Sequence, residues 1–175
     1  MGFKDVFSEL EQLASAGVVE GYAIGGAVGA TFYIEPNATE DIDVFVASLP
    51  GAGDTLLTLK PIFDFLTVRG AVVRGEHLVI GGWPVQFLPA TTPLVEHALH
   101  EAREETVEGQ ATKVFSEEHL AAIALETGRP KDKIRLLQFL ESASLDRKRV
   151  DGLVSTFGLT EKWARFSAQF LGDQS

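Results

Sequence analysis

The chain of 175 residues contains no cysteine, which excludes a disulfide framework, thiol catalysis and metal sites built from thiolates. It also contains no stretch close to the roughly 20 consecutive apolar residues that span a membrane as a helix. Its first residues lack the basic start and the apolar run of a signal peptide. Since disulfides are rare in the cytoplasm, we expect a cytoplasmic protein that has no membrane partner.

Positive charge is scarce in this sequence and unevenly placed. Lysine and arginine number 15 against 25 aspartates and glutamates, and the net charge of −10 argues against broad electrostatic binding to nucleic acid. The basic residues are concentrated, however, because residues 128–149 contain seven of them and only three acidic residues. Such a strip either grips phosphate groups or forms the solvated face of a helix.

The hydrophobic pattern indicates an α+β fold, because short β-type runs alternate with helical segments up to about residue 115 and the rest is helical. We expect a first strand formed by 18–19 and 22–24, further strands at 41–47, 71–74, 77–80 and 85–88, and a small hairpin within 106–114. We expect a first helix that ends before Gly17, and further helices at 27–33, 56–66, 93–102, 119–126, 131–140, 147–156 and 160–170. The prediction is a small mixed β-sheet with helices in residues 1–115, followed by a C-terminal helical subdomain in residues 116–175.

The most informative part of the sequence is a glycine pair followed by a strand with two carboxylates. Gly25-Gly26 ends one predicted strand where a helix can begin, and Asp41 and Asp43 lie at positions i and i+2 of the next strand. Alternate side chains of a strand share a face, so both aspartates point the same way while Ile42 points into the core. Two like charges this close repel, and a cation between them removes the repulsion. The pattern therefore predicts a divalent-metal site.

The same elements suit a metal-bound triphosphate. Free N–H groups at the helix start after Gly25-Gly26 favour an anion, and glycine lets phosphates approach the backbone. Mg²⁺ takes oxygen ligands, usually one or two carboxylates together with substrate phosphates. We therefore expect a site for Mg²⁺ (or Mn²⁺) and a nucleoside triphosphate. The alternatives are an exposed or backbone-capping aspartate pair, and a glycine pair that only permits close strand–helix packing.

These residues resemble the signature of the nucleotidyltransferase superfamily typified by DNA polymerase β: an apolar residue, Gly-Gly or Gly-Ser, a spacer, and Asp-x-Asp or Asp-x-Glu. Residues 22–43 look most like the AbiEii-like toxin and minimal nucleotidyltransferase group, whose helical Gly-Arg-x-Lys-Asp segment is matched by residues 128–132. The resemblance implies a nucleotidyltransferase-like domain in residues 1–115. It implies metal binding and catalysis by Asp41 and Asp43, and nucleotide binding by Gly25, Gly26, Thr39, Arg129 and Lys131.

The sequence departs from this family at three polar positions. A later strand carries a third carboxylate in the family, and here the matching residue is Gln86, whose amide ligates a metal weakly and accepts no proton near neutral pH. Asn37 stands where the family has a basic residue, and about Ala124 stands where it has a helical lysine. Gln86 is therefore either a catalytic-site position or an outward-facing strand residue.

The resemblance and its departures leave three functions open. The first is transfer of an NMP group from an NTP to a hydroxyl of RNA, a protein or a small molecule. The second is a catalytically inactive nucleotidyltransferase-fold module for binding or regulation, with a partner protein in a toxin–antitoxin pair. The third is a structural α+β interaction protein.

The other charged groups have simpler interpretations. Lys131 and Asp132 form either a salt bridge at a helix start or part of a phosphate site, for which Arg129 is the better candidate. The four histidines show no zinc spacing. Since His97 and His100 share a predicted helix with neighbouring glutamates, we expect a surface cluster there and no metal site.

Overall fold

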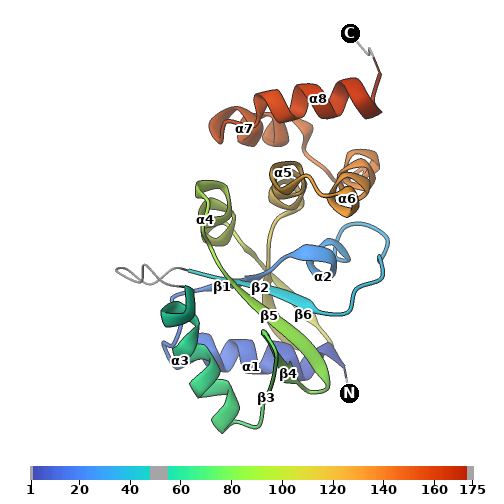
Figure 1. Ribbon diagram of the computed structural model, residues 1–175. Helices are drawn as coiled ribbons and strands as arrows, with labels where there is room; N and C mark the ends of the chain where they lie inside the picture. The colour runs from blue at the N-terminus through green and yellow to red at the C-terminus, as the bar shows by residue number, and fades with distance from the viewer. Residues whose placement is uncertain (1, 48–54, 173–175) are drawn as a thin grey trace.

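The computed structural model of the protein describes residues 2–47 and 55–172, and within them it contains a seven-stranded sheet and eight helices (Figure 1). The strands are β1 (Tyr22–Ile24), β2 (Ile42–Val46), β3 (Val72–Arg74), β4 (His77–Ile80), β5 (Trp83–Pro89), β6 (Arg103–Val107) and β7 (Gln110–Val114). The helices are α1 (Phe3–Ser15), α2 (Gly26–Ala30), α3 (Thr55–Val68), α4 (Pro93–His100), α5 (Glu117–Thr127), α6 (Pro130–Glu141), α7 (Arg147–Thr156) and α8 (Thr160–Phe170). The predicted α+β class is confirmed, with a mixed sheet followed by a helical C-terminal part.

The sheet runs in the order β3-β4-β5-β2-β1-β7-β6, which puts β2 and β1 near its centre. β2 pairs antiparallel with β1 and parallel with β5, while β1 pairs parallel with β7. The outer strands join as antiparallel hairpins, and the hairpin of β4 and β5 turns at Gly81-Gly82. The strand with the carboxylates therefore has a neighbour on each side.

β2 alternates between the two faces of the sheet, as its sequence predicts. Ile42, Val44 and Val46 are fully buried on one face, whereas Asp43 and Phe45 are partly exposed on the other. The apolar face belongs to a buried cluster with side chains of α1 and α3, and Phe45 packs against a second cluster formed with α4 to α8. Figure 1 shows the same layers, with α1 and α3 below the sheet and the C-terminal helices above it.

α5 is the centre of the helical part, and most of its side chains are buried. Ser116 caps its start by accepting a hydrogen bond from the backbone N–H of His119, and Gly128 ends it in a left-handed conformation (φ +65°). Because Ala23 of β1 and Leu120 of α5 belong to one buried cluster, the division into domains at residue 115 stays a prediction. Across residues 2–47 and 55–172, no helix is both long and apolar enough to cross a membrane.

Several predicted boundaries are wrong by a few residues. β2 begins at Ile42, so Asp41 lies one residue before the strand rather than in it. α2 ends at Ala30 and continues only as turns, because its last carbonyls are satisfied by i→i+3 bonds such as that from the Tyr33 N–H to the Ala30 carbonyl. β6 begins at Arg103, since its ladder with β7 extends the small hairpin beyond the β-type run in the sequence. β2 ends at Val46, one residue before the expected end of that strand, and β1 begins at Tyr22, so Val18 and Val19 lie before the strand rather than in it.

Candidate active site

The glycine pair makes a tight turn against β2. Gly26 has φ +56°, and a Cβ there would lie 1.9 Å from Oδ2 of Asp43. A Cβ on Gly25 would lie 2.6 Å from the ring of Phe45, and the N–H of Gly25 donates to the Asp43 carbonyl at 3.0 Å. Glycine is thus required at both positions by close packing and at Gly26 by conformation as well. Close packing is thus one role of the glycine pair, and it places the turn directly against Asp43. Phosphate binding by the pair stays a prediction.

The helix that follows the turn is shorter than the sequence suggests. α2 has five residues, and the Gly29 N–H already donates to the Gly25 carbonyl at 2.8 Å. A single helical turn sums few peptide dipoles, so its N-terminus attracts anions only weakly. The turn would therefore help a phosphate mainly because glycine has no side chain that blocks its approach to the backbone.

Asp41 and Asp43 both line the cleft between the sheet and the helical part. The hydroxyl of Thr39 donates to the Asp41 carbonyl at 2.9 Å and approaches Oδ1 of Asp41 at 3.3 Å. On the other side, Nε2 of His77 in β4 lies 3.3 Å from Oδ2 of Asp41. Burial raises the pKa of Asp43, and the neighbouring charge of Asp41 raises it further. The pair therefore gains stability from any cation that it shares.

Three cations face the aspartates from the opposite wall. Arg129 precedes α6, while Lys131 and Arg135 belong to it, and all three line the cleft. Their positive charges lower the pKa of Asp43 and so offset part of its rise. Lys131 has the largest effect, followed by Arg129 and Arg135. This arrangement puts positive charge where phosphate oxygens of a metal-bound nucleotide would lie.

A buried carboxylate holds two of these cations. Asp132 has a side chain only 3% exposed, and it accepts from Nε of Arg129 at 2.7 Å and from Nη1 of Arg135 at 3.5 Å. Bonding to Asp132 raises the pKa of Arg129, whereas burial lowers that of Arg135. The suggested salt bridge between Lys131 and Asp132 is wrong, because within the described residues the ion pairs of Asp132 are with the two arginines. Lys131 is left to face the cleft.

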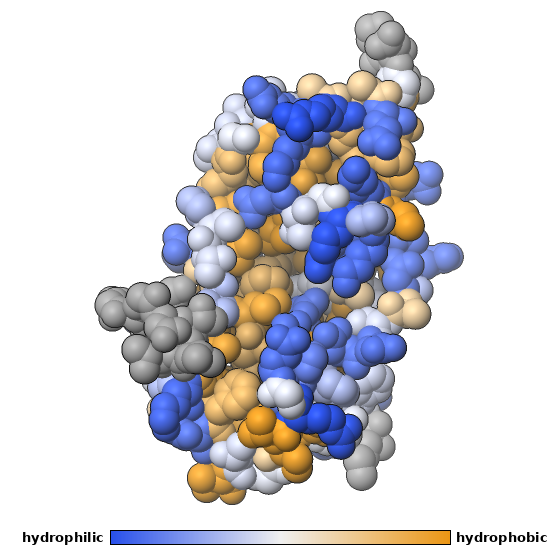
Figure 2. Space-filling view, viewed as in Figure 1, coloured by the Kyte–Doolittle hydropathy of each residue, from blue (hydrophilic) through white to orange (hydrophobic). Residues whose placement is uncertain are grey.

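The cleft consists of two connected cavities, of about 630 Å³ and 270 Å³. Both are lined by the aspartates and the three cations: Asp41, Asp43, Arg129, Lys131 and Arg135. The larger cavity continues along residues 37–40, and the smaller one along β2, β5 and α5. The face in Figure 2 is hollowed between the helices above and the sheet below, with hydrophilic residues along one side of the hollow. The carboxylates thus stand where the two cavities meet.

Gln86 lies beside Asp43 in the sheet. The two residues are register partners in the parallel pair of β2 and β5, and Gln86 lines the smaller cavity. The structure therefore brings it to the cleft, where a third carboxylate would lie next to the pair. Ala124 lines the same cavity, and Asn37 lines the larger one, where its Nδ2 donates to Oε1 of Gln138 in α6 at 2.8 Å.

Sequence reasoning missed one residue of the cleft, Arg135, and one residue that contacts Asp41, His77. Arg135 follows Lys131 by one helical turn, so its place on the same face could have been predicted from the i, i+4 spacing. His77 reaches Asp41 only because β4 lies two strands from β2, with β5 between them, and no local pattern signals this contact.

Comparison with known proteins identifies the fold. No protein-family model matches the sequence, and no curated protein does. A crystal structure of ANT(2'')-Ia in complex with adenylyl-2''-tobramycin is similar to this chain with a TM-score of 0.55 and 16% identity, covering 89% of this chain and 97% of that chain. A solution structure of the antibiotic-resistance factor ANT(2'')-Ia gives a TM-score of 0.54 and 15% identity, covering 94% of each chain.

An antigenic nucleotidyltransferase-like protein from Paracoccidioides brasiliensis is also similar, with a TM-score of 0.55 and 16% identity over 95% of this chain and 90% of that chain. The chain therefore has a nucleotidyltransferase-like fold. The narrower assignment to the AbiEii-like group stays a prediction.

Proposed function

We propose that this protein is a metal-dependent nucleotidyltransferase that binds a nucleoside triphosphate in the cleft and transfers its NMP group to a hydroxyl acceptor. The observation that carries this proposal is that Asp41 and Asp43 line both cavities opposite three cations. A nucleotide in one cavity and an acceptor in the other would meet at the carboxylates. The acceptor is a hydroxyl of RNA, a protein or a small molecule.

The donors present fit Mg²⁺ or Mn²⁺. Asp41 and Asp43 offer hard carboxylate oxygens, and the raised pKa of Asp43 reflects the cost of leaving the pair without a cation. When bound, such an ion neutralises the triphosphate and polarises the phosphorus that is attacked. The two aspartates would hold the ion, and Thr39 would orient Asp41 through their hydrogen bond.

The remaining cleft residues would bind the nucleotide. Gly25 and Gly26 let a phosphate approach the backbone, while Arg129, Lys131 and Arg135 supply positive charge for phosphate oxygens. In the larger cavity, the exposed side chain of Ile134 offers an apolar surface for a base or ribose. These groups bind and orient the substrate, and such positioning supplies most of the catalysis in phosphoryl transfer.

In the reaction, the acceptor oxygen forms a bond to the α-phosphorus while the bond to the bridging oxygen breaks and pyrophosphate leaves. The acceptor proton then has to reach a carboxylate or water. Gln86 cannot take it, and Asp132 in the smaller cavity is already held by two arginines. The proton would therefore leave to solvent, to Glu40, which lines the larger cavity, or to one of the two aspartates.

The replacement of a third carboxylate by Gln86 favours one alternative. In it, the protein is a catalytically inactive module of the same fold that binds nucleotide or metal and serves a partner protein, as in a toxin–antitoxin pair. Both functions suit a protein of the cytoplasm, where nucleoside triphosphates are available. The two functions differ in whether the protein transfers an NMP group to an acceptor.

Transfer of label from α-labelled NTPs to candidate acceptors, with Mn²⁺ or Mg²⁺, tests the proposal. The double variant Asp41→Asn, Asp43→Asn should lose transfer and metal-dependent NTP binding, while Asp64→Asn on the exposed surface of α3 should retain both. Transfer that persists in the double variant excludes this mechanism. Calorimetry with a non-hydrolysable NTP separates the alternatives, because binding without transfer on any acceptor supports the inactive module.

A further inference from the structure

Away from the cleft, two histidines and a glutamate from separate parts of the chain meet where α4 lies against α5. His97 belongs to α4, Glu101 follows the end of α4, and His119 lies in the first turn of α5. Nδ1 of His97 is 2.8 Å from Nε2 of His119, and Nε2 of His97 is 4.0 Å from Oε1 of Glu101. One nitrogen or oxygen of each residue lies within 4.8 Å of the others. The cleft mechanism uses none of these groups.

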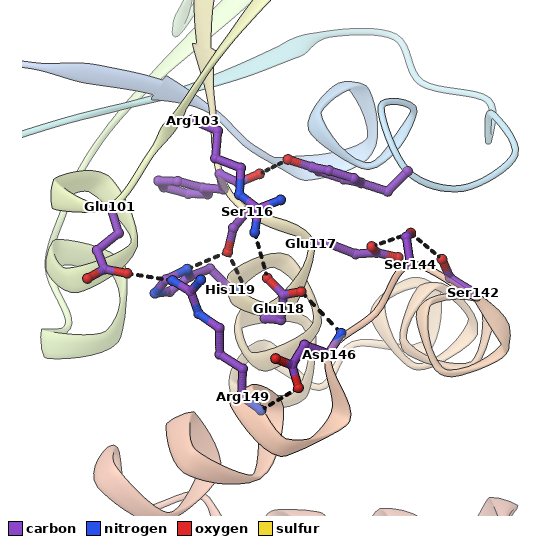
Figure 3. A network of polar contacts seen from close by, with 12 residues as sticks. Glu101, Arg103, Ser116, Glu117, Glu118, His119, Ser142, Ser144, Asp146 and Arg149 are labelled. Atoms are coloured by element: carbon purple, nitrogen blue, oxygen red, sulfur yellow. Dashed lines mark hydrogen bonds and ion pairs between the residues drawn. The ribbon is translucent and has the colours of Figure 1, made fainter.

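A contact with the second ring nitrogen of His119 fixes the orientation of its ring. Its side chain is fully buried, and Nδ1 lies 2.6 Å from the hydroxyl of Ser116, which also caps α5 (Figure 3). This contact directs Nε2 toward His97. Metal-binding histidines usually have their second ring nitrogen held in this way, which sets the ring orientation and the tautomer.

Glu101 is held in a similar manner. Nη2 of Arg149 in α7 donates to Oε2 of Glu101 (Figure 3). The other carboxylate oxygen, Oε1, is the one that lies 4.0 Å from Nε2 of His97. Arg149 is thus paired with Glu101, and the other arginine of the network, Arg103, is paired with Glu118. Glu118, which is 3% exposed, accepts from Arg103 and from the backbone N–H of Asp146. The surroundings therefore do not exclude a cation on electrostatic grounds.

We propose that His97, Glu101 and His119 form a binding site for a transition-metal ion of the Zn²⁺ type, which would join α4 to α5. Two imidazoles and one carboxylate are donors that Zn²⁺ and Co²⁺ favour and that Mg²⁺ does not. The site therefore differs in chemistry from the pair Asp41 and Asp43, which offers oxygen alone.

The two histidines need only a small adjustment, and Glu101 a larger one, because the 4.0 Å contact of its Oε1 is with Nε2 of His97, whereas Nδ1 of His97 faces His119. Tetrahedral Zn²⁺ with Zn–N bonds of about 2.0 Å holds two nitrogens roughly 3.3 Å apart, so the histidine nitrogens must separate by about 0.5 Å. His97 can move, because its side chain is 42% exposed, and Glu101 is exposed to a similar extent. The exposed side leaves room for water as a fourth ligand.

A competing interpretation is that the two rings form a hydrogen-bonded pair that only packs α4 against α5. His97 also contacts the ring of Phe157, with the centroids 5.3 Å apart, as a packing residue would. This interpretation predicts no saturable metal binding.

A titration with Co²⁺, followed by its visible d–d absorption, distinguishes the two. The full-length variant Asp41→Asn, Asp43→Asn serves as the parent, because it removes the carboxylate pair that would compete for the ion. Since the chain has no cysteine, any tetrahedral spectrum must come from nitrogen and oxygen donors. We expect saturation at one ion per chain in the parent.

His97→Gln tests the ligand and His100→Gln is the matched control, because His100 lies on the same helix, outside the cluster. The spectrum should vanish in His97→Gln and persist in His100→Gln. His119→Gln is avoided, since a buried change can prevent folding. No saturable spectrum in the parent up to ~1 mM Co²⁺, or equal binding by His97→Gln and His100→Gln, overturns the proposal.

Thermal unfolding with Zn²⁺ gives an independent readout. At saturating Zn²⁺ the Tm of the parent and of His100→Gln should rise by about 5 °C or more, because the ion binds only the folded state. The Tm of His97→Gln should stay unchanged. An equal rise in all three variants would mean that the ion binds elsewhere, and the proposed site would be wrong.

Discussion

The two walls of the cleft hold their charged groups in different ways. The sheet wall presents Asp43 from β2, fixed by the strand ladder and by the glycine turn packed against it. Asp41 lies one residue before β2, with contacts to Thr39 and His77. The helix wall presents its cations from the start of α6, where one buried side chain, Asp132, binds both arginines. The negative wall is therefore set by the backbone, and the positive wall by a side-chain ion network.

The largest effect should come from breaking the helix wall with Asp132→Asn. This change leaves Arg135, whose side chain is 11% exposed, without its ionic partner, and unpaired buried charges cost about 3 kcal/mol of the free energy of unfolding. Urea denaturation measures the loss, and NTP affinity should fall with it.

Asp64→Asn is the control for Asp132→Asn, because the ion pair of Lys60 and Asp64 is exposed at both ends and should contribute less than about 1 kcal/mol. Equal effects of the two substitutions would contradict the anchoring role of Asp132.

Gly26→Ala breaks the sheet wall. The left-handed conformation costs about 1 kcal/mol for alanine, and the clash of the new Cβ with Asp43 adds at least as much, for a total of about 2 kcal/mol. Gly75→Ala is matched to it, since Gly75 has φ +62° and open space around its Cβ. Should both variants lose the same stability in urea, conformation alone would explain the need for glycine, and the contact with Asp43 would not matter.

Gln86→Asp sharpens the comparison by adding a carboxylate to the sheet wall next to Asp43. A third acid can accept the acceptor proton and ligate a second ion, so label transfer should rise by about tenfold. Gln86→Leu controls for the change of shape. Lower transfer in Gln86→Asp than in the native chain would show that the amide itself is required.

The smallest effect concerns Asp43 in the metal-free protein. Burial raises its pKa above the ordinary value of 3.8, so the folded state binds its proton more tightly than the unfolded chain does. This contribution to stability is present below pH 3.8 and is lost as the pH rises through the folded pKa. Asp43→Asn should therefore be more stable than the native chain by about 1 kcal/mol at neutral pH, with a smaller difference toward pH 4.

Thermal unfolding at several pH values measures the effect of Asp43→Asn, and adding Mg²⁺ with NTP should reverse the order of the two proteins. A native chain that is the more stable one without metal would contradict the idea that the aspartate pair is held under repulsion.

The sheet wall was the more predictable of the two walls. Its carboxylates lie at i and i+2 and its glycines follow an apolar run, so the strand period alone puts them together. The α+β class and the order of elements followed from the same kind of local pattern. The roles of these residues in binding and catalysis stay predictions.

The helix wall and the α4–α5 junction depend on contacts between distant segments. His97 and His119 are 22 residues apart and adjoin only because α4 packs on α5, so the expectation of a surface cluster around His97 and His100 missed His119. Asp132 and Lys131 are adjacent in sequence, yet Asp132 turns to the arginines because it is buried. The spacing of charged residues along the chain does not show which of them will form ion pairs in the folded protein.

Because the two cavities share five charged side chains, the two substrates of the proposed reaction would influence each other's binding through these residues. If the first substrate moves Lys131 or Arg135 or changes its charge, the affinity for the second substrate changes. The second substrate must then change the affinity for the first by the same factor. The order in which two substrates arrive can then change the kinetics, but not the total free energy of assembling the ternary complex.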